Sequence, residues 1–366
     1  LRLEFFNRRW LLDCGVGPES DQGFDPAWLN KVNAVFITHD HIDHIGAADE
    51  IIAAGLPIYC TDVTARSLPK GANVIPLPPV GEIQVDGVTV TTGRTGHSFG
   101  GVWLHFEIGG GVLYSGDFCQ ESDYFLYDAP PDAATVLLDA SYGMEGLTQN
   151  VRIDSLLTTM TKLDGQILFP VPPSGRAAEM ALLFERNGLT DWSMDERCYG
   201  QVKQVLDARG SDYVDGDAIR RLRAVKDKAK HFNPDARLLL CHAPCATYGK
   251  ARELIDGWRD AGRMGSSAHV IFTGFMPVNA RKMVEKGHAH FRRWNVHPLA
   301  QHVVNVRRTA QLPGNAPGVG LDRPGHIVAR HHIDQPVKHR RCAAAGRAQF
   351  LLPDHAAAGR VNCREL

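Results

Sequence analysis

The first part of the chain, up to about residue 142, is a series of short apolar runs separated by tight turns. The run Ala34–Thr38 is continuous and contains β-branched residues, which is typical of a buried strand. The segment Ile45–Ala54 has the composition of a helix and is closed by Gly55. We expect further strands at Leu1–Phe6, Trp10–Asp13, Ile58–Cys60, Val88–Thr92, Val102–Ile108, Val112–Ser115 and Val136–Asp139.

Beyond Tyr142 the pattern changes to an alternation of strands and helices. The expected strands are Gln166–Val171, Arg237–Cys241 and Val270–Thr273, and the expected helices are Gly175–Asn187 and Tyr248–Ala261. This alternation predicts a parallel sheet flanked by helices. We therefore expect an α/β protein with a core at 1–145, an inserted βα domain at 146–292, a return to the core at 293–300 and a tail at 301–366.

The tail has no clear hydrophobic period, and arginines mix there with Ala, Pro, Gly and His. One interpretation is a flexible basic tail. The other is non-native sequence, such as an out-of-frame reading of a GC-rich gene. The chain also opens without Met, inside the strand expected at Leu1–Phe6, which indicates a fragment that lacks the first strand of its core.

Composition and charge narrow the classes of function. The formal net charge of −1 over 366 residues excludes a globally basic nucleic-acid binder, although a local basic groove would not show in that sum. No apolar run approaches the roughly 20 residues that span a bilayer. The eight cysteines form no CxxC pair, so we expect reduced thiols and a cytoplasmic protein. We interpret Cys241-His-Ala-Pro-Cys245 as a strand end, with a metal site as the alternative.

The candidate chemistry is concentrated in the segment His39–His44, directly after the strand expected at Ala34–Thr38. Three histidines and two aspartates lie within these six consecutive residues. Imidazole nitrogens and carboxylate oxygens suit zinc, and also iron or manganese. A solvated polar turn is the alternative, but the HxHxDH spacing at the carboxyl end of a strand, where α/β sites form, favours a metal site.

HxHxDH followed by Gly46 resembles the second motif of the metallo-β-lactamase superfamily. Three segments around it resemble the first, third and fourth motifs in order: Trp10–Gly15, Thr95–Ser98 and Tyr114–Phe118. The resemblance implies an αββα sandwich and two divalent metal ions, zinc first and iron or manganese as alternatives. It implies that one ion is held by His39, His41 and His97, the other by Asp43 and His44, with Asp117 between them and Asp13 supporting the histidine loop.

The same resemblance implies how such a site works. Two ions lower the pKa of a bridging water to near neutrality and hold the attacked group. Asp43 would then orient the metal-activated hydroxide. Metal-bound histidines usually donate their other ring N–H to an acceptor, which Asp13 or Asp40 would supply.

The residues after the fourth motif resemble the β-CASP branch, which includes ribonuclease J and the endonuclease of messenger-RNA 3′-end processing. Asp139 in Leu137–Gly143 matches the acidic motif A, and His297 falls where motif B places a general acid for the leaving group. Leu168–Glu179 and Val270–Phe275 resemble segments of the branch's inserted βα domain. The resemblance covers roughly residues 1–300.

Motif C, a late histidine that completes the second metal site, has no convincing counterpart. The candidates all lie in the tail: His326, His331, His332, His339 and His355. We therefore expect the second metal site to be incomplete.

These observations favour a metal-dependent phosphodiesterase, a nuclease acting on RNA or single-stranded nucleic acid. Asp43, Asp139 and His297 are the candidate catalytic residues. One alternative is a hydrolase of small esters, thioesters or lactones with the same fold, and another is a catalytically impaired remnant. We expect no membrane partner, and a homodimer because members of this family often dimerise.

Overall fold

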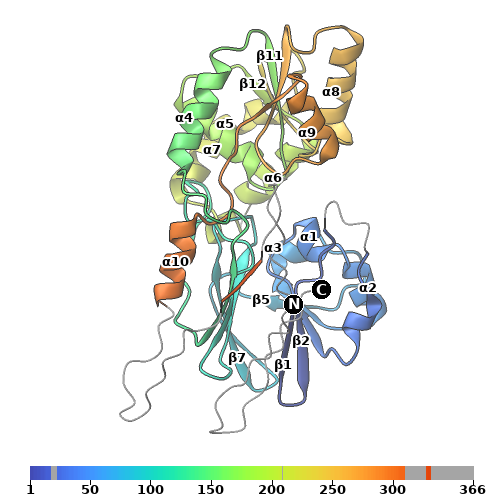
Figure 1. Cartoon of the computed structure of the whole chain (residues 1–366), viewed down its shortest axis with the longest axis vertical. Helices are drawn as coiled ribbons and strands as arrows, with labels where there is room; N and C mark the ends of the chain where they lie inside the picture. Colours follow the sequence, from blue (N-terminus) through green and yellow to red (C-terminus); the bar gives the residue numbers. More distant parts are fainter. Residues whose placement is uncertain (18–22, 208, 310–326, 331–366) are drawn as a thin grey trace. The chain divides into compact units, whose positions relative to one another are not determined.

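The computed structural model describes residues 1–17, 23–207, 209–309 and 327–330 (Figure 1). The chain forms two compact units. The first contains Leu1–Gln120, Tyr127–Met144 and the described residues from His297 onward. The second contains Glu121–Leu126 and Glu145–Val296.

The first unit is built on two sheets. One has the strand order β1-β2-β3-β4-β5, with bounds Arg2–Phe5, Arg8–Leu12, Ala34–Phe36, Ile58–Thr61 and Val74–Leu77. The other has the order β16-β10-β9-β8-β7-β6; from β6 to β10 the bounds are Gly81–Val85, Val88–Arg94, Val102–Phe106, Val112–Tyr114 and Thr135–Asp139, and β16 is Ile327–Arg330. Their facing side chains share one core, which includes Trp10 and Phe36 from the first sheet and Leu104 and Phe106 from the second.

Helices cover the outer faces of both sheets. Beside the first sheet lie the 3-10 helix Pro26–Leu29 and the helices α1 (Ile42–Ile45), α2 (Ala48–Ala53) and α3 (Asp62–Ala65). Ile51 of α2 packs there with Val35 of β3. On the second sheet, α10 (Ala300–Thr309) places Val306 against Leu113 and Leu138. The layers are therefore helix, sheet, sheet and helix, and the expected αββα sandwich is confirmed.

The second unit holds a parallel sheet with the order β12-β13-β11-β14-β15. From β11 to β15 its bounds are Gln166–Pro170, Trp192–Met194, Leu238–Cys241, Ala268–Phe272 and His290–Phe291. Its helices are α4 (Gln149–Met160), α5 (Arg176–Arg186), α6 (Glu196–Leu206), the 3-10 helix Gly210–Asp212, α7 (Gly216–Lys230), α8 (Gly249–Asp260) and α9 (Val278–Glu285). The expected inserted βα fold is confirmed.

The structure differs from the sequence-based expectation around the histidine cluster. The single helix expected at Ile45–Ala54 is two short helices, α1 and α2. The chain passes tightly at Gly46, where a Cβ would lie 2.5 Å from the carbonyl oxygen of Ile42. Because α1 begins at Ile42, Asp43 and His44 lie on a helical turn rather than on an open loop.

The tail expected at 301–366 shows no clear hydrophobic period, but its described residues contain regular structure. In α10 the apolar residues Val303 and Val306 follow helical spacing and pack on the second sheet, but this apolar run is short and lies among polar residues. β16 pairs in parallel with β10. The tail histidines at 326, 331, 332, 339 and 355 lie outside the described residues.

Within the described part of the chain, no helix is long and apolar enough to cross a membrane.

Candidate metal centre

The candidate ligands come from three segments of the first unit, each of which follows a strand. His39 and His41 lie between β3 and α1, and His44 lies within α1. His97 follows β7, and Asp117 follows β9. The backbone at the end of a strand is held by the sheet, so side chains attached there keep one position. Such positions suit a preorganised site.

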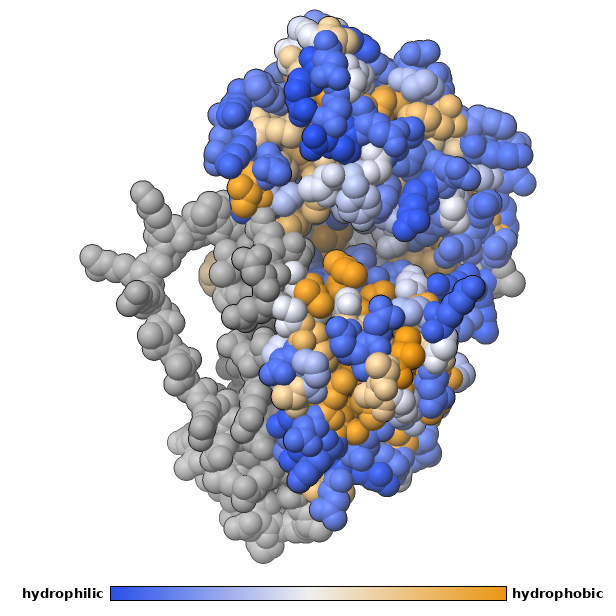
Figure 2. All heavy atoms as spheres, turned by 90° about the vertical axis from the view of Figure 1, so that its right-hand side faces the viewer, coloured by the Kyte–Doolittle hydropathy of each residue, from blue (hydrophilic) through white to orange (hydrophobic). Residues whose placement is uncertain are grey.

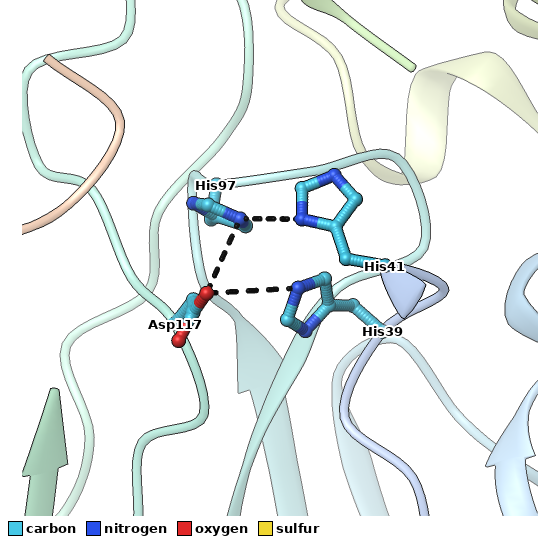
Figure 3. A group of neighbouring side chains, drawn as sticks. All are labelled: His39, His41, His97 and Asp117. Atoms are coloured by element: carbon cyan, nitrogen blue, oxygen red, sulfur yellow. Dashed lines mark hydrogen bonds and ion pairs between the residues drawn. The ribbon is translucent and has the colours of Figure 1, made fainter. Parts of the chain in front are cut away.

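Figure 3 shows the first group, in which the side chains of His39, His41, His97 and Asp117 point toward one another. The Oδ2 atom of Asp117 lies 3.8 Å from Nε2 of His39 and 3.7 Å from Nε2 of His97. Nε2 of His97 lies 3.1 Å from Nδ1 of His41. Ligand atoms about 2.1 Å from one tetrahedral ion are about 3.4 Å apart, so these spacings suit a shared ion.

A second group uses the same carboxylate. Nε2 of His44 lies 3.3 Å from Oδ2 of Asp117 and 3.7 Å from Oδ2 of Asp43. The two groups of candidate ligands therefore share Asp117.

One ring nitrogen that faces this region supports a metal ion. Nε2 of His39, 3.8 Å from Oδ2 of Asp117, is buried and makes no hydrogen bond to any residue that the structure describes. Buried polar atoms in proteins are nearly always partnered. The donor set of neutral imidazole and carboxylate thus fits a divalent ion, in accordance with the cofactor that the sequence led us to expect.

Asp13 holds the histidine segment from behind. Its Oδ2 lies 2.7 Å from Nδ1 of His44 and accepts from the Tyr114 hydroxyl at 2.7 Å. Its Oδ1 accepts from the backbone N–H of Thr38 at 2.8 Å. Asp13 thereby fixes the ring of His44 with Nε2 directed toward Asp117.

The roles of Asp40 and Tyr114 differ from the sequence-based expectation. Asp40, the other expected acceptor for a histidine, instead accepts from the Ser67 hydroxyl at 2.8 Å. The donor role of Tyr114 was missed, although Tyr114 lies in the fourth motif. No local signal could have shown it, because Tyr114 and Asp13 are 101 residues apart in the chain.

The pKa values of the buried His39, His44 and Asp117 are shifted by burial and by their neighbours. Burial lowers the pKa of His39 well below its usual value, and the neighbouring histidines lower it further. Burial alone would raise the pKa of Asp117, but His44 and His297 outweigh it and hold that pKa well below the usual range. Burial likewise opposes the charged form of His44, yet Asp117 and Asp13 raise its pKa well above the usual value. A neutral His39 and an ionised Asp117 are the forms that bind a metal ion.

The candidate catalytic pair lies beside the same carboxylate. Asp139 ends β10, and its Oδ2 lies 2.8 Å from Nδ1 of His297. Its Oδ1 accepts from the backbone N–H of Ser141 at 2.8 Å and from the Ser141 hydroxyl at 2.6 Å. The ring of Tyr142 meets that of His297 edge to face at 5.2 Å. Nδ1 of His297 is also 3.8 Å from Oδ2 of Asp117. Asp117, Asp139 and His297 therefore form a further group that could hold an ion.

Comparison with known proteins identifies the part of the chain that carries most of these residues. Residues 8–154 match the family model described as the Beta-lactamase superfamily domain. This stretch is therefore similar to a beta-lactamase superfamily domain. Of the candidate site residues, only His297 lies outside the matched stretch.

Several relatives of this chain carry names from transcription termination and RNA processing. Transcription termination factor FttA of Methanothermobacter thermautotrophicus is 29% identical over 245 residues, which are 52% of this chain and 38% of that relative. Cleavage and polyadenylation specificity factor 73 of Drosophila melanogaster is 26% identical over 323 residues, 70% of this chain and 46% of the relative. Endoribonuclease YSH1 of Candida albicans is 20% identical over 352 residues, 75% of this chain and 39% of the relative.

The chain thus spans less than half the length of these three relatives. The family match and the relatives together confirm the resemblance to the metallo-β-lactamase superfamily and its β-CASP branch.

Proposed function

We propose that this protein is a metal-dependent phosphodiesterase that cleaves RNA or single-stranded nucleic acid. The observation that carries the proposal is the position of Asp117. Its carboxylate belongs to each group of candidate ligands found among the described residues, and one of those groups contains the Asp139–His297 pair. A hydrolytic metal site with an adjacent acid–base pair is what phosphodiester cleavage needs.

In this proposal His39, His41, His97 and Asp117 hold one divalent ion, and Asp43, His44 and Asp117 hold a second. The mixed nitrogen and oxygen donors favour zinc, with iron and manganese as alternatives. Ions bound there would lower the pKa of a water molecule and offset the charge that develops on the phosphate. Asp43 is assigned to orient the attacking water.

The protein's own side chains supply positioning and a proton. Asp13 fixes His44 through the 2.7 Å contact with Nδ1. Asp139 fixes His297 in the same way, with Nδ1 directed at Oδ2. With the Nδ1 proton held by Asp139, Nε2 of His297 is the atom that protonates the leaving oxygen.

The names of the relatives support an RNA substrate. One is an endoribonuclease, and another is a cleavage and polyadenylation specificity factor. A cytosolic location forms part of the proposal, because the cysteines in the described residues are free thiols, as expected in a reducing compartment. Homodimer formation also stays a prediction.

The test is an assay of single-stranded RNA cleavage by the metal-reconstituted chain, beside a panel of esters, thioesters and lactones. We expect RNA cleavage by the wild type and none by His41→Ala, which removes one ligand. If ester or lactone turnover depends on His41 and no RNA is cleaved, the nuclease proposal fails. The protein would then be a hydrolase of small molecules.

A further inference from the structure

We propose that the loop 242–249 of the second unit is a contact for single-stranded RNA, in which a base stacks on the ring of Tyr248. The contact is formed by Tyr248, His242 and Arg197, called here the Tyr248 cluster. The inference rests on the proposed function, because a nuclease for single strands must hold unpaired nucleotides outside its reacting centre.

The cluster lies where ligands bind in sheets of this kind. The loop leaves the carboxyl end of β13 and leads into α8, whereas the neighbouring strand β11 leads into α5. Residues of α8 and α9 pack on one face of the sheet, and Figure 1 draws α5 and α7 on its other side. Adjacent strands whose chains leave to opposite faces form a crevice at their carboxyl ends, which is the usual ligand position in parallel α/β sheets.

Tyr248 does not behave as a packing residue. Its side chain is 61% exposed, although it is the N-cap residue of a helix that packs on the sheet. The ring of His242 meets it edge to face at 5.4 Å and 77°. This contact steadies the tyrosine ring and leaves it exposed to solvent. A rigid exposed aromatic ring is the element on which unpaired bases stack.

Arg197 supplies a cation near His242. It is exposed and lies in the first turn of α6, whose N-cap residue Asp195 accepts from the backbone N–H of His242 at 2.7 Å. Burial lowers the pKa of His242, and the charge of Arg197 lowers it further. Arg197 is thus available to a phosphate of a strand that stacks on Tyr248.

The acids near the cluster leave its charge small. Both carboxylate oxygens of Asp195 accept from backbone N–H groups, one of Cys198 at 2.8 Å and one of His242 at 2.7 Å. Glu253 pairs with Lys250. Glu196 is exposed beside Arg197 and offsets part of its charge. We therefore expect stacking to supply most of the affinity and the ionic contact only a small part.

The residues of the cluster come from different elements, so no local pattern in the sequence predicts it. The interpretation of Cys241-His-Ala-Pro-Cys245 as a strand end agrees with the end of β13 at Cys241. Among the described residues this segment belongs to no group of candidate metal ligands.

The test is binding of the full chain to a short, nuclease-resistant 2′-O-methyl phosphorothioate strand, followed by fluorescence anisotropy. Tyr248→Ala should weaken binding about 5-fold to 100-fold, the range for loss of one stacked base. Tyr248→Phe keeps the ring and should bind within about twofold of the wild type. Arg197→Ala should reduce the dependence on salt by about one ion or less.

Phe6→Ala is the matched control, because Phe6 is 67% exposed in the β1–β2 turn, remote in the chain from the loop. It should bind as the wild type does. A strand of the same length without bases should bind equally to the wild type and to Tyr248→Ala. Circular dichroism of each variant checks that the fold is kept.

The inference is overturned if Tyr248→Ala binds as Phe6→Ala does, or if it loses affinity equally for the strand without bases. Cleavage by the wild type judges the proposed function separately. If the wild type cleaves RNA while Tyr248→Ala binds normally, only this inference fails. If binding depends on the Tyr248 ring but no RNA is cut, the contact is supported and the nuclease proposal fails.

Discussion

At the scale of single residues, the Asp139–His297 pair fits two chemically distinct roles, general acid catalysis and metal binding. Its 2.8 Å contact through Nδ1 is the arrangement that orients a general acid. The same two side chains and Asp117 also lie close enough to share an ion. The roles differ in what the loss of His297 does to metal content and in which substrates it slows.

As a general acid, His297 matters only when the leaving oxygen needs a proton. We predict that His297→Ala slows RNA cleavage by about 100-fold or more, the usual contribution of a positioned acid. Hydrolysis of a p-nitrophenyl phosphodiester, whose leaving group needs no proton, should change little. The measurement is kcat for both substrates, with the metal content of each preparation. Equal losses on both substrates, or loss of bound metal, would assign Asp139 and His297 to metal binding instead.

At the scale of elements, short-range patterns were readable from the sequence and long-range partners were not. The strand ending before His39 and the helix α5 were predicted because apolar spacing and turn residues are local. The split into α1 and α2 was missed because it depends on the close passage at Gly46. The candidate ligands were found by motif spacing, whereas Tyr114 was not, since its contact with Asp13 exists only after the two sheets pack.

Helix caps in the second unit offer a direct test of local energetics. The Asp215 side chain accepts from the backbone N–H groups of Asp217 at 2.8 Å and Ala218 at 3.1 Å at the start of α7. Asp215→Ala should therefore lower the free energy of unfolding by about 1 kcal/mol. The measurement is the midpoint of denaturant unfolding. Thr148→Ala is the control, because Thr148 is the N-cap of α4 but makes no such bond. Equal effects of the two substitutions would refute this account of α7.

In the first unit, an ion pair at the end of β7 predicts a dependence of stability on pH. Arg94 donates to Asp128 at 2.6 Å and 2.7 Å. These side-chain hydrogen bonds hold the pKa of Asp128 below its usual value, although burial opposes them. A lowered pKa stabilises the fold fully above the unfolded value of about 3.9, and this contribution is lost as the pH falls through the folded value.

Asp128→Asn should therefore lower the free energy of unfolding by about 1 kcal/mol near neutral pH, a small value because the pair is partly exposed. The difference from the wild type should shrink below about pH 4. Asp86→Asn is the control, since Asp86 makes a single 3.2 Å contact with the more exposed Arg8. Denaturant unfolding across this pH range is the measurement. A difference that stays constant with pH would contradict the role of Arg94.

At the scale of the whole molecule, the candidate metal centre and the inserted βα fold belong to different compact units. The candidate ligands and the Asp139–His297 pair lie in the first unit, which also contains most of the stretch that matches the family model. The Tyr248 cluster lies in the second. Mutations can therefore affect catalysis at the candidate metal centre and RNA binding at the Tyr248 cluster separately. In Figure 2 hydrophobic residues gather in one area of the visible face, and hydrophilic residues border them.

The metal content of the intact chain tests the central claim most directly. After reconstitution with zinc, iron or manganese and removal of free ions, the wild type should retain at least one ion per chain by mass spectrometry. Asp117→Ala should lose it while its circular dichroism stays that of the wild type, because Asp117 is common to the candidate ligand groups. A folded wild-type chain that retains none of the three metals would contradict the account, and with it both enzymatic functions.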